Sequence, residues 1–419
     1  MSWDHTPPPT LFTGCDPAVL ADCRGRVVAV DEDALERGRG SAVVVEVEGR
    51  AWPGLGDAHL HLHELVGLRL GLDLRSARSL EEAIQTVRAA ARTAPEGGWI
   101  TGTGWNERNW TDHGVPTRQA LDEAAPGRPV LLSSHDEHTV WASSRALEMA
   151  GITAELPDPG DGIVERDPDG VPNGLVRECL RLFAGLVPPP GRDQYEQTLA
   201  DVLLELARLG LCSVHTMDPP ETLFALQRLR ERGRLPLRVV VNLPADQLDS
   251  AADLGLRGGW GDPLLRVFGV KAFLDGSLGS GTAEMLGGGG VARLSDAELD
   301  DLIRRCSAAE LNPCLHAIGD GAVHRALVAL ERHAGAWPGW RPRIEHAQLV
   351  DPDDLPRFLR AGAVASMQPA HAPSDRRVAD ERWGDRTAHA YAWSWLAAAG
   401  VPLAFGSDAP VESADPLLG

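Results

Sequence analysis

Lysine is almost absent from this 419-residue chain. Of the 40 basic residues one is a lysine, Lys271, and the other 39 (40 − 1) are arginines. Arginine stays protonated, whereas a buried lysine changes its pKa readily and can act as a nucleophile. Lys271 lies in the apolar run 267–274, which is typical of a buried strand. Because an unpaired buried ammonium is costly, we expect Lys271 to be neutralised, modified, or paired with a carboxylate such as Asp275.

Other scarce features exclude several classes of protein. The six cysteines form no Cys-x-x-Cys pair, which predicts reduced thiols and a cytoplasmic protein. The N-terminus lacks a basic segment followed by an apolar one, and no apolar run approaches the roughly 18 residues of a membrane span. The net charge of −20 argues against a nucleic-acid partner. We therefore expect a small-molecule substrate, no nucleic acid and no membrane, with a homo-oligomer as an open alternative.

The order of strand-like and helix-like runs predicts an α/β fold. Residues 1–52 hold short strand-like runs between turns, as in a small β-sandwich segment. From residue 53 to 419 we expect a (β/α)8 TIM-like barrel, with an insert at about 64–190 after its first strand, which covers 56–62. The other seven strand-like runs alternate mostly with helix-like runs, and they end at His215, Asn242, Lys271, His316, His346, Gln368 and Asp408.

The ends of these strands carry side chains that bind metal ions. In a barrel of this kind the C-terminal strand ends form the active-site face. The candidate ligands are neutral imidazoles, a carboxylate and the lysine, which are His59, His61, Lys271, His316, His346 and Asp408. Two divalent ions about 3.5–4 Å apart need a bridging anion. A carbamate formed from Lys271 and CO2 would supply one, and Asp408 would also accept the proton of the attacking water.

Each of these residues also has an ordinary structural explanation when it is taken alone. His-x-His occurs in many strands, because alternate residues share a face. A single His316 or His346 is often a buried histidine with satisfied hydrogen bonds. The whole set, placed at successive strand ends, favours a site for two divalent ions, with zinc preferred and manganese, iron or cobalt open. His63 shares the predicted face but lies further along, so we expect it outside the ligand set.

Five motifs resemble the amidohydrolase superfamily, and most closely amidohydrolase family 3, the YtcJ-like hydrolases that include N-substituted formamide deformylases. The motifs are Pro-Gly-Leu-Gly-Asp-Ala-His-Leu-His (53–61), Val-Lys-Ala-Phe-Leu-Asp-Gly-Ser-Leu-Gly-Ser-Gly-Thr (270–282), His-Ala-Ile-Gly-Asp (316–320), Ile-Glu-His-Ala (344–347) and Phe-Gly-Ser-Asp-Ala-Pro-Val (405–411). The resemblance runs from about residue 10 to the end of the chain. It implies a metal-dependent barrel with a small β-sandwich, the same six ligands, and Lys271 as a carbamate.

The resemblance also indicates a second group of residues. In the insert, Asp136, His138 and Glu178 become candidates for substrate contact or metal support, although surface polar residues would look the same. His215 and Asp218 follow the second barrel strand, where they would line the site or support its ligands.

The chain differs from the family pattern at its C-terminus. The family adds a last barrel helix and returns to complete the β-sandwich, whereas this chain stops eleven residues after Asp408 (419 − 408). We therefore expect an incomplete sandwich and a barrel without its closing helix.

The leading hypothesis is a hydrolase that cleaves an amide or formamide-type C–N bond, other than a peptide bond, with a metal-activated hydroxide. An esterase, lactonase or phosphoesterase on the same site is one alternative, and a truncated, inactive barrel fragment is another.

Overall fold

The structure is a computed structural model that describes residues 8–418 apart from 24, 95–96, 136–138, 159–161 and 178. It divides into two compact units, residues 1–55 and 56–419, and each is described by itself.

The first unit is a small sheet with one helix. Its elements are β1 (Thr10–Asp16), β2 (Val19–Ala21), β3 (Val27–Val30), α1 (Asp31–Gly38) and β4 (Val43–Arg50). The strand order is β3-β2-β1-β4, with β1 and β4 parallel and the other pairs antiparallel. Leu11, Leu20 and Ala34 form its core, and Gly38 approaches Leu11 so closely that a Cβ there would lie 2.9 Å from it. The sequence had indicated short strands in this segment but not the helix α1.

The second unit contains the predicted barrel. Among the described residues, its sheet has eight strands in the order β18-β17-β16-β15-β14-β13-β12-β5, and each pair from β12 to β18 is parallel. The strands are β5 (Leu55–Leu60), β12 (Leu211–Thr216), β13 (Arg238–Pro244), β14 (Leu265–Phe273), β15 (Asn312–Ala317), β16 (Arg343–His346), β17 (Val364–Met367) and β18 (Leu403–Phe405). The α/β barrel prediction is confirmed, and each strand ends within three residues of its predicted end.

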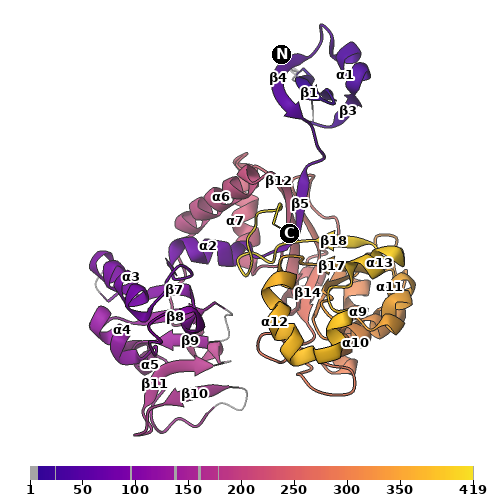
Figure 1. Ribbon diagram of the computed structural model, residues 1–419. Coiled ribbons are helices and arrows are strands. Elements are labelled where there is room, and N and C mark those ends of the chain that lie inside the picture. Colours follow the sequence, from indigo (N-terminus) through magenta and orange to yellow (C-terminus); the bar gives the residue numbers. More distant parts are fainter. Residues whose placement is uncertain are drawn as a thin grey trace. The chain divides into compact units, whose positions relative to one another are not determined.

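Helices cover the outside of this sheet, as α9, α10 and α11 do in Figure 1. The helices of this region are α6 (Arg192–Arg208), α7 (Pro220–Glu231), α8 (Leu248–Asp253), α9 (Asp296–Ala308), α10 (Asp320–Glu331), α11 (Leu355–Ala361), α12 (His371–Trp383) and α13 (Trp393–Ala398), with short 3-10 turns at Ala245–Gln247, Pro352–Asp354 and Gly384–His389. Local sequence explains several boundaries. Helix α9 begins with a capping box between Ser295 and Glu298, and α11 ends at Gly362, whose φ of 64° suits glycine.

The barrel closes where its first and last strands meet. Leu60 bridges to Ala409, the amide of His61 donates to the carbonyl of Ala409, and the amide of Asp408 donates to the carbonyl of His59. Gly406 allows this contact, because a Cβ at that position would lie 2.4 Å from the backbone nitrogen of His59. The candidate ligands His59 and Asp408 are therefore neighbours across the closing seam.

The predicted insert forms a second sheet within this unit. Its strand order is β10-β11-β9-β8-β7-β6. The elements are α2 (Leu62–Leu70), β6 (Leu72–Asp73), α3 (Leu80–Thr93), β7 (Ile100–Trp105), α4 (Arg118–Ala124), β8 (Val130–Ser134), β9 (Thr139–Ala142), α5 (Ser144–Met149), β10 (Ile163–Arg166) and β11 (Pro172–Arg177), with 3-10 turns at Glu107–Asn109 and Leu180–Phe183. Trp105, Trp110 and Trp141 are buried together in its core, so these aromatic side chains serve packing.

Candidate metal centre

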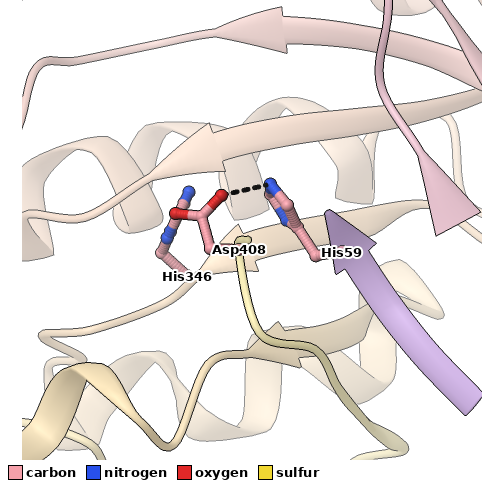
Figure 2. Close-up of side chains that lie close together, drawn as sticks. All are labelled: His59, His346 and Asp408. Atoms are coloured by element: carbon pink, nitrogen blue, oxygen red, sulfur yellow. Dashed lines mark ion pairs between the residues drawn. The ribbon is translucent and has the colours of Figure 1, made fainter. Parts of the chain in front are cut away.

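Side chains from the first, sixth and eighth barrel strands meet at one point. Donor atoms of His59, His346 and Asp408 all lie within 4.8 Å of one another, and all three residues are buried. Figure 2 shows the Asp408 carboxylate between the two imidazoles. This is the convergence expected of strand ends in a barrel, because residues far apart in sequence come together there.

The Asp408 carboxylate contacts a histidine on each side. Its Oδ1 lies 3.2 Å from Nε2 of His61 and 3.4 Å from Nε2 of His59, and its Oδ2 lies 3.3 Å from Nε2 of His371. Burial alone would raise the pKa of Asp408, but the surrounding histidines, His59 first, hold it well below its usual range. Asp408 therefore carries a negative charge in this site.

Both Asp408 and His346 adopt a backbone conformation that is rare outside glycine. Their φ values are 59° and 72°. Such residues cost about 1–3 kcal/mol each and are found mainly where the surrounding structure holds them for a function. For Asp408 the constraint is visible, since its amide is bonded across the barrel seam.

Lys271 lies on the inner side of β14 and completes the centre. Its Nζ is 3.4 Å from Nε2 of His59, the residue is 4% exposed, and burial lowers its pKa. The alternative partner, Asp275, instead accepts hydrogen bonds from the backbone amides of Ile318, Gly319 and Glu284. The structure thus places Lys271 beside the candidate ligand His59.

The remaining histidines present lone pairs. Within the described residues, Nδ1 of His316 and Nδ1 of His346 are buried and have no hydrogen-bond partner. Nε2 of His316 lies 3.1 Å from the carbonyl oxygen of Gly276, so that nitrogen is the donor and Nδ1 is the acceptor. Burial and the charge of Lys271 lower the pKa of His316 to about 3, and burial also lowers the pKa of His346 well below its usual value.

These observations test whether a divalent ion fits. The unpartnered nitrogens, the neutral imidazoles of His59, His316 and His346, and the ionised carboxylate of Asp408 make a donor set that suits zinc and similar ions. The structure brings all six predicted ligands together: ring centroids are 5.4 Å apart for His59 and His61, and 4.5 Å for His316 and His346. Their roles as ligands stay a prediction.

His61 lies on the more open side of the centre. Its side chain is 15% exposed, and its Nδ1 lies 3.9 Å from Oδ1 of Asp218. Asp218 is itself buried and accepts a hydrogen bond from Thr216. Burial would lower the pKa of His61, but the carboxylates of Glu64, Asp408 and Asp218 raise it to about 9. Asp218 therefore supports His61, in line with the position predicted for it.

His215 does not contact the centre directly. Its Nδ1 lies 2.8 Å from Nη1 of Arg343, inside the barrel. Burial and the charge of Arg343 lower its pKa to about 3, so it is a neutral acceptor. The other predicted supporting residues, Asp136, His138 and Glu178, lie outside the residues that the structure describes.

The sequence predicted that His59, His61 and His63 share one face. The prediction holds for His59 and His61, which both contact Asp408, and is wrong for His63. Strand β5 ends at Leu60, and α2 begins at Leu62, so His63 is helical. Its Nδ1 lies 2.9 Å from the hydroxyl of Tyr195, outside the ligand set as expected.

Sequence reasoning missed three residues near the centre. His371 begins α12 and contacts Asp408, while Arg343 and Glu345 form an ion pair below His59. Arg343 and Glu345 are two residues apart on a buried strand, so a pair of opposite charges on one face was a usable signal. For His371 the sequence holds no comparable signal, because it follows the strand in a helix.

The described helices include none that is long and apolar enough to cross a membrane.

Comparisons with known proteins agree with this centre. A model of the amidohydrolase family matches residues 47–419. The chain belongs to the amidohydrolase family. Putative amidohydrolase YtcJ of Bacillus subtilis is 32% identical over 383 residues, covering 88% of this chain and 72% of that protein. N-substituted formamide deformylase of Arthrobacter pascens is 27% identical, covering 96% and 79%. The resemblance to amidohydrolase family 3 is therefore confirmed.

A solved structure extends this likeness to the fold. The crystal structure of a metal-dependent hydrolase from Pyrococcus furiosus matches with a TM-score of 0.77 and 28% identity, covering 98% of this chain and 86% of the other. The amidohydrolase chain thus shares its barrel with a metal-dependent hydrolase.

Proposed function

We propose that this amidohydrolase cleaves a C–N bond, other than a peptide bond, in a small amide or formamide-type substrate. The observation that carries the proposal is the meeting of buried histidines, an ionised Asp408 and the single lysine at the C-terminal end of the barrel. The similarity to a protein named N-substituted formamide deformylase supports the choice of bond.

The proposed cofactor is a pair of divalent ions, with zinc preferred. His59, His61, His316, His346 and Asp408 would hold them. Lys271 would bridge them as a carbamate: its neutral Nζ attacks the carbon of CO2, an N–C bond forms, one proton leaves the nitrogen, and the displaced electron pair goes to oxygen. Burial favours this chemistry, because it lowers the pKa of the amine and disfavours the ammonium. The product is an anion with two oxygens.

The chain's own groups would then manage the protons. When bound, divalent ions lower the pKa of water toward about 7 and polarise a carbonyl group. Asp408, held ionised at the seam, accepts the proton of the attacking water and delivers it to the departing nitrogen. His371 contacts Oδ2 of Asp408 and so orients that carboxylate. The amine and the carboxylic acid then leave as separate products.

Metal content per chain, measured by elemental analysis of the purified monodisperse protein, is the decisive test. About two ions per chain are expected for a carbamate-bridged centre. About one ion would contradict the bridging role of Lys271, and none would contradict the metal centre.

A substrate panel tests the choice of bond. Formamides, acetamides, esters, lactones and phosphoesters would be compared at equal concentration with the metal-loaded protein. Faster turnover of the amides is expected, and preference for the oxygen compounds would reassign the enzyme as an esterase, lactonase or phosphoesterase.

A further inference from the structure

A buried ion pair lies inside the barrel, between its core and the metal centre. Arg343 and Glu345 lie on β16, two residues apart, and are 3% and 0% exposed. Their groups meet through two contacts, Nε to Oε1 at 2.8 Å and Nη2 to Oε2 at 3.0 Å. The second contact is a charge-assisted hydrogen bond, whereas the first is an ion pair without hydrogen-bond geometry.

Arg343 also joins several barrel strands. It donates hydrogen bonds to the carbonyl of Ala58 on β5, to Nδ1 of His215 on β12, and to Oγ of Ser366 on β17. The guanidinium therefore has acceptors on both sides, and its orientation is fixed. A buried arginine held in this way fixes the carboxylate that it pairs with.

The Glu345 oxygen that accepts from Nη2 of Arg343 also contacts the candidate metal centre. This oxygen, Oε2, lies 2.8 Å from Nδ1 of His59. The buried guanidinium of Arg343, in contact with both carboxylate oxygens, holds Glu345 as a carboxylate. An ionised carboxylate is an acceptor only, so its 2.8 Å contact places the proton on Nδ1 of His59. The amide nitrogen of Gln368 lies 3.3 Å from the same Nδ1, which is the longer of the two contacts. Nε2 of His59 then presents its lone pair toward Lys271 and Asp408.

We propose that Arg343 and Glu345 are positioning residues that lock His59 in its Nδ1–H form and so set the affinity of the centre for metal. The inference rests on the metal centre proposed above. Carboxylates behind ligating histidines have this effect in metal proteins, and their loss typically costs about 10–100-fold in affinity. Here the support has two layers, since the carboxylate is itself held by an arginine with three further acceptors.

A purely structural ion pair is the rival explanation, and the chain supplies a matched control. Glu196 on α6 is 3% exposed and pairs with Arg228, at 2.6 Å, and with Arg232 on the outer layer of the barrel. It is a buried carboxylate between arginines, as Glu345 is, but it contacts no candidate ligand. Loss of either carboxylate removes a buried partner from an arginine, which is destabilising in itself.

The experiment compares Glu345→Gln with Glu196→Gln by competition of the apo-proteins with a chelator for zinc and cobalt(II). We expect Glu345→Gln to bind metal about 10–100-fold more weakly and Glu196→Gln to bind within about twofold of wild type. Equal losses in both variants, or wild-type affinity in Glu345→Gln, would overturn the inference. If the wild type binds metal and the two variants show the same affinity, this inference fails while the proposed function stands.

Two further measurements cover a variant that fails to fold. The double variant Arg343→Met/Glu345→Gln removes both charges and leaves none unpaired, and the same loss of affinity is expected. Nitrogen-15 NMR of histidine-labelled wild-type apo-protein, with His59 assigned through a His59→Gln variant, reports the tautomer directly. A proton on Nδ1 is expected, and a proton on Nε2 would refute the inference even where no variant is available.

Discussion

Two neighbouring histidines, His59 in β5 and His61 directly after it, are supported in different ways. The side chain of His59 is fully buried and its Nδ1 lies 2.8 Å from Glu345. The side chain of His61 is 15% exposed, and its Nδ1 lies 3.9 Å from Asp218. His59 is fixed by the buried ion pair of Glu345 and Arg343. The carboxylate nearest to Nδ1 of His61, that of Asp218, is beyond hydrogen-bond distance.

The difference separates two tasks within a single centre. A fixed donor keeps its orientation without reorganisation, which favours metal affinity. A donor with loose support can shift as a substrate arrives, because no short hydrogen bond opposes the movement. In the proposed centre, the buried side would serve retention of the ions, and the more exposed side would serve turnover.

Asp408→Asn is expected to have the largest effect, because the Asp408 carboxylate contacts both His59 and His61. We expect turnover to fall by about 10^3-fold or more with the fold retained, since the amide cannot accept the proton. The kcat on the preferred amide substrate measures the effect. His63→Gln is the control, because His63 bonds to Tyr195 instead, and it should leave kcat unchanged.

Lys271→Arg tests whether a carbamate on Lys271 bridges the two proposed ions. Arginine keeps a positive charge but forms no carbamate, so metal content should fall from about two ions to about one, with a loss of activity of about 100-fold. Lys271→Glu restores a carboxylate and should retain more metal than Lys271→Arg. Normal activity in Lys271→Arg would exclude the carbamate.

Gly406→Ala tests the close packing of the backbone against His59 at the barrel seam. A Cβ there would lie 2.4 Å from the nitrogen of His59, so we expect a loss of about 1–3 kcal/mol in the free energy of unfolding. Gly67→Ala, in α2 beyond His61, has open space and should instead stabilise the protein by about 0.5–1 kcal/mol. Urea denaturation measures both, and equal effects would contradict the packing account.

His215 contacts Arg343 in the buried network behind His59, and its titration makes the stability of the protein depend on pH. Its pKa is about 3 in the folded protein and about 6.5 in the unfolded chain, so its contribution to stability is complete above pH 6.5 and declines as the pH falls toward 3. His215→Asn keeps an acceptor for Arg343 but does not titrate. Between pH 6 and 4 the apo variant should lose stability less steeply than wild type, by about 1.4 kcal/mol per pH unit. Parallel stability curves would contradict this assignment.

Asp218→Asn is expected to have the smallest effect. Because Asp218 lies 3.9 Å from His61, metal affinity should fall by about threefold or less, well below the loss expected for Glu345→Gln. Chelator competition measures both variants side by side. A larger loss of metal affinity in Asp218→Asn than in Glu345→Gln would contradict the view that His59 is the more firmly supported histidine.

The barrel and the six candidate ligands could be predicted because each depends on local pattern. Buried parallel strands give apolar runs such as 265–273, and the chemistry-bearing residue stands at the end of each run. Alternation predicted that His59 and His61 share one side, and both contact Asp408 although β5 ends at Leu60. It failed at His63, since the strand gives way to a helix at Leu62 and the period changes.

The supporting residues depend on long-range register and could not be placed in the same way. Arg343 and Glu345 acquire their partners only when β16 lies opposite β5 and β12 across the barrel. His371 reaches Asp408 because α12 starts directly after β17. Two opposite charges on a buried strand indicate that a partner exists, but the fold decides which one.

The closing seam has a consequence for how the protein matures. His59 and Asp408 stand on the first and last strands of the barrel, joined by backbone bonds that form only when the ring of strands is complete. Contacts between such distant parts of a chain are slow to form, because the intervening loop must be ordered first. A half-formed barrel thus holds its candidate ligands apart. For the proposed metal centre, ions would bind the completed barrel in preference, and their binding would then stabilise the closed ring by mass action.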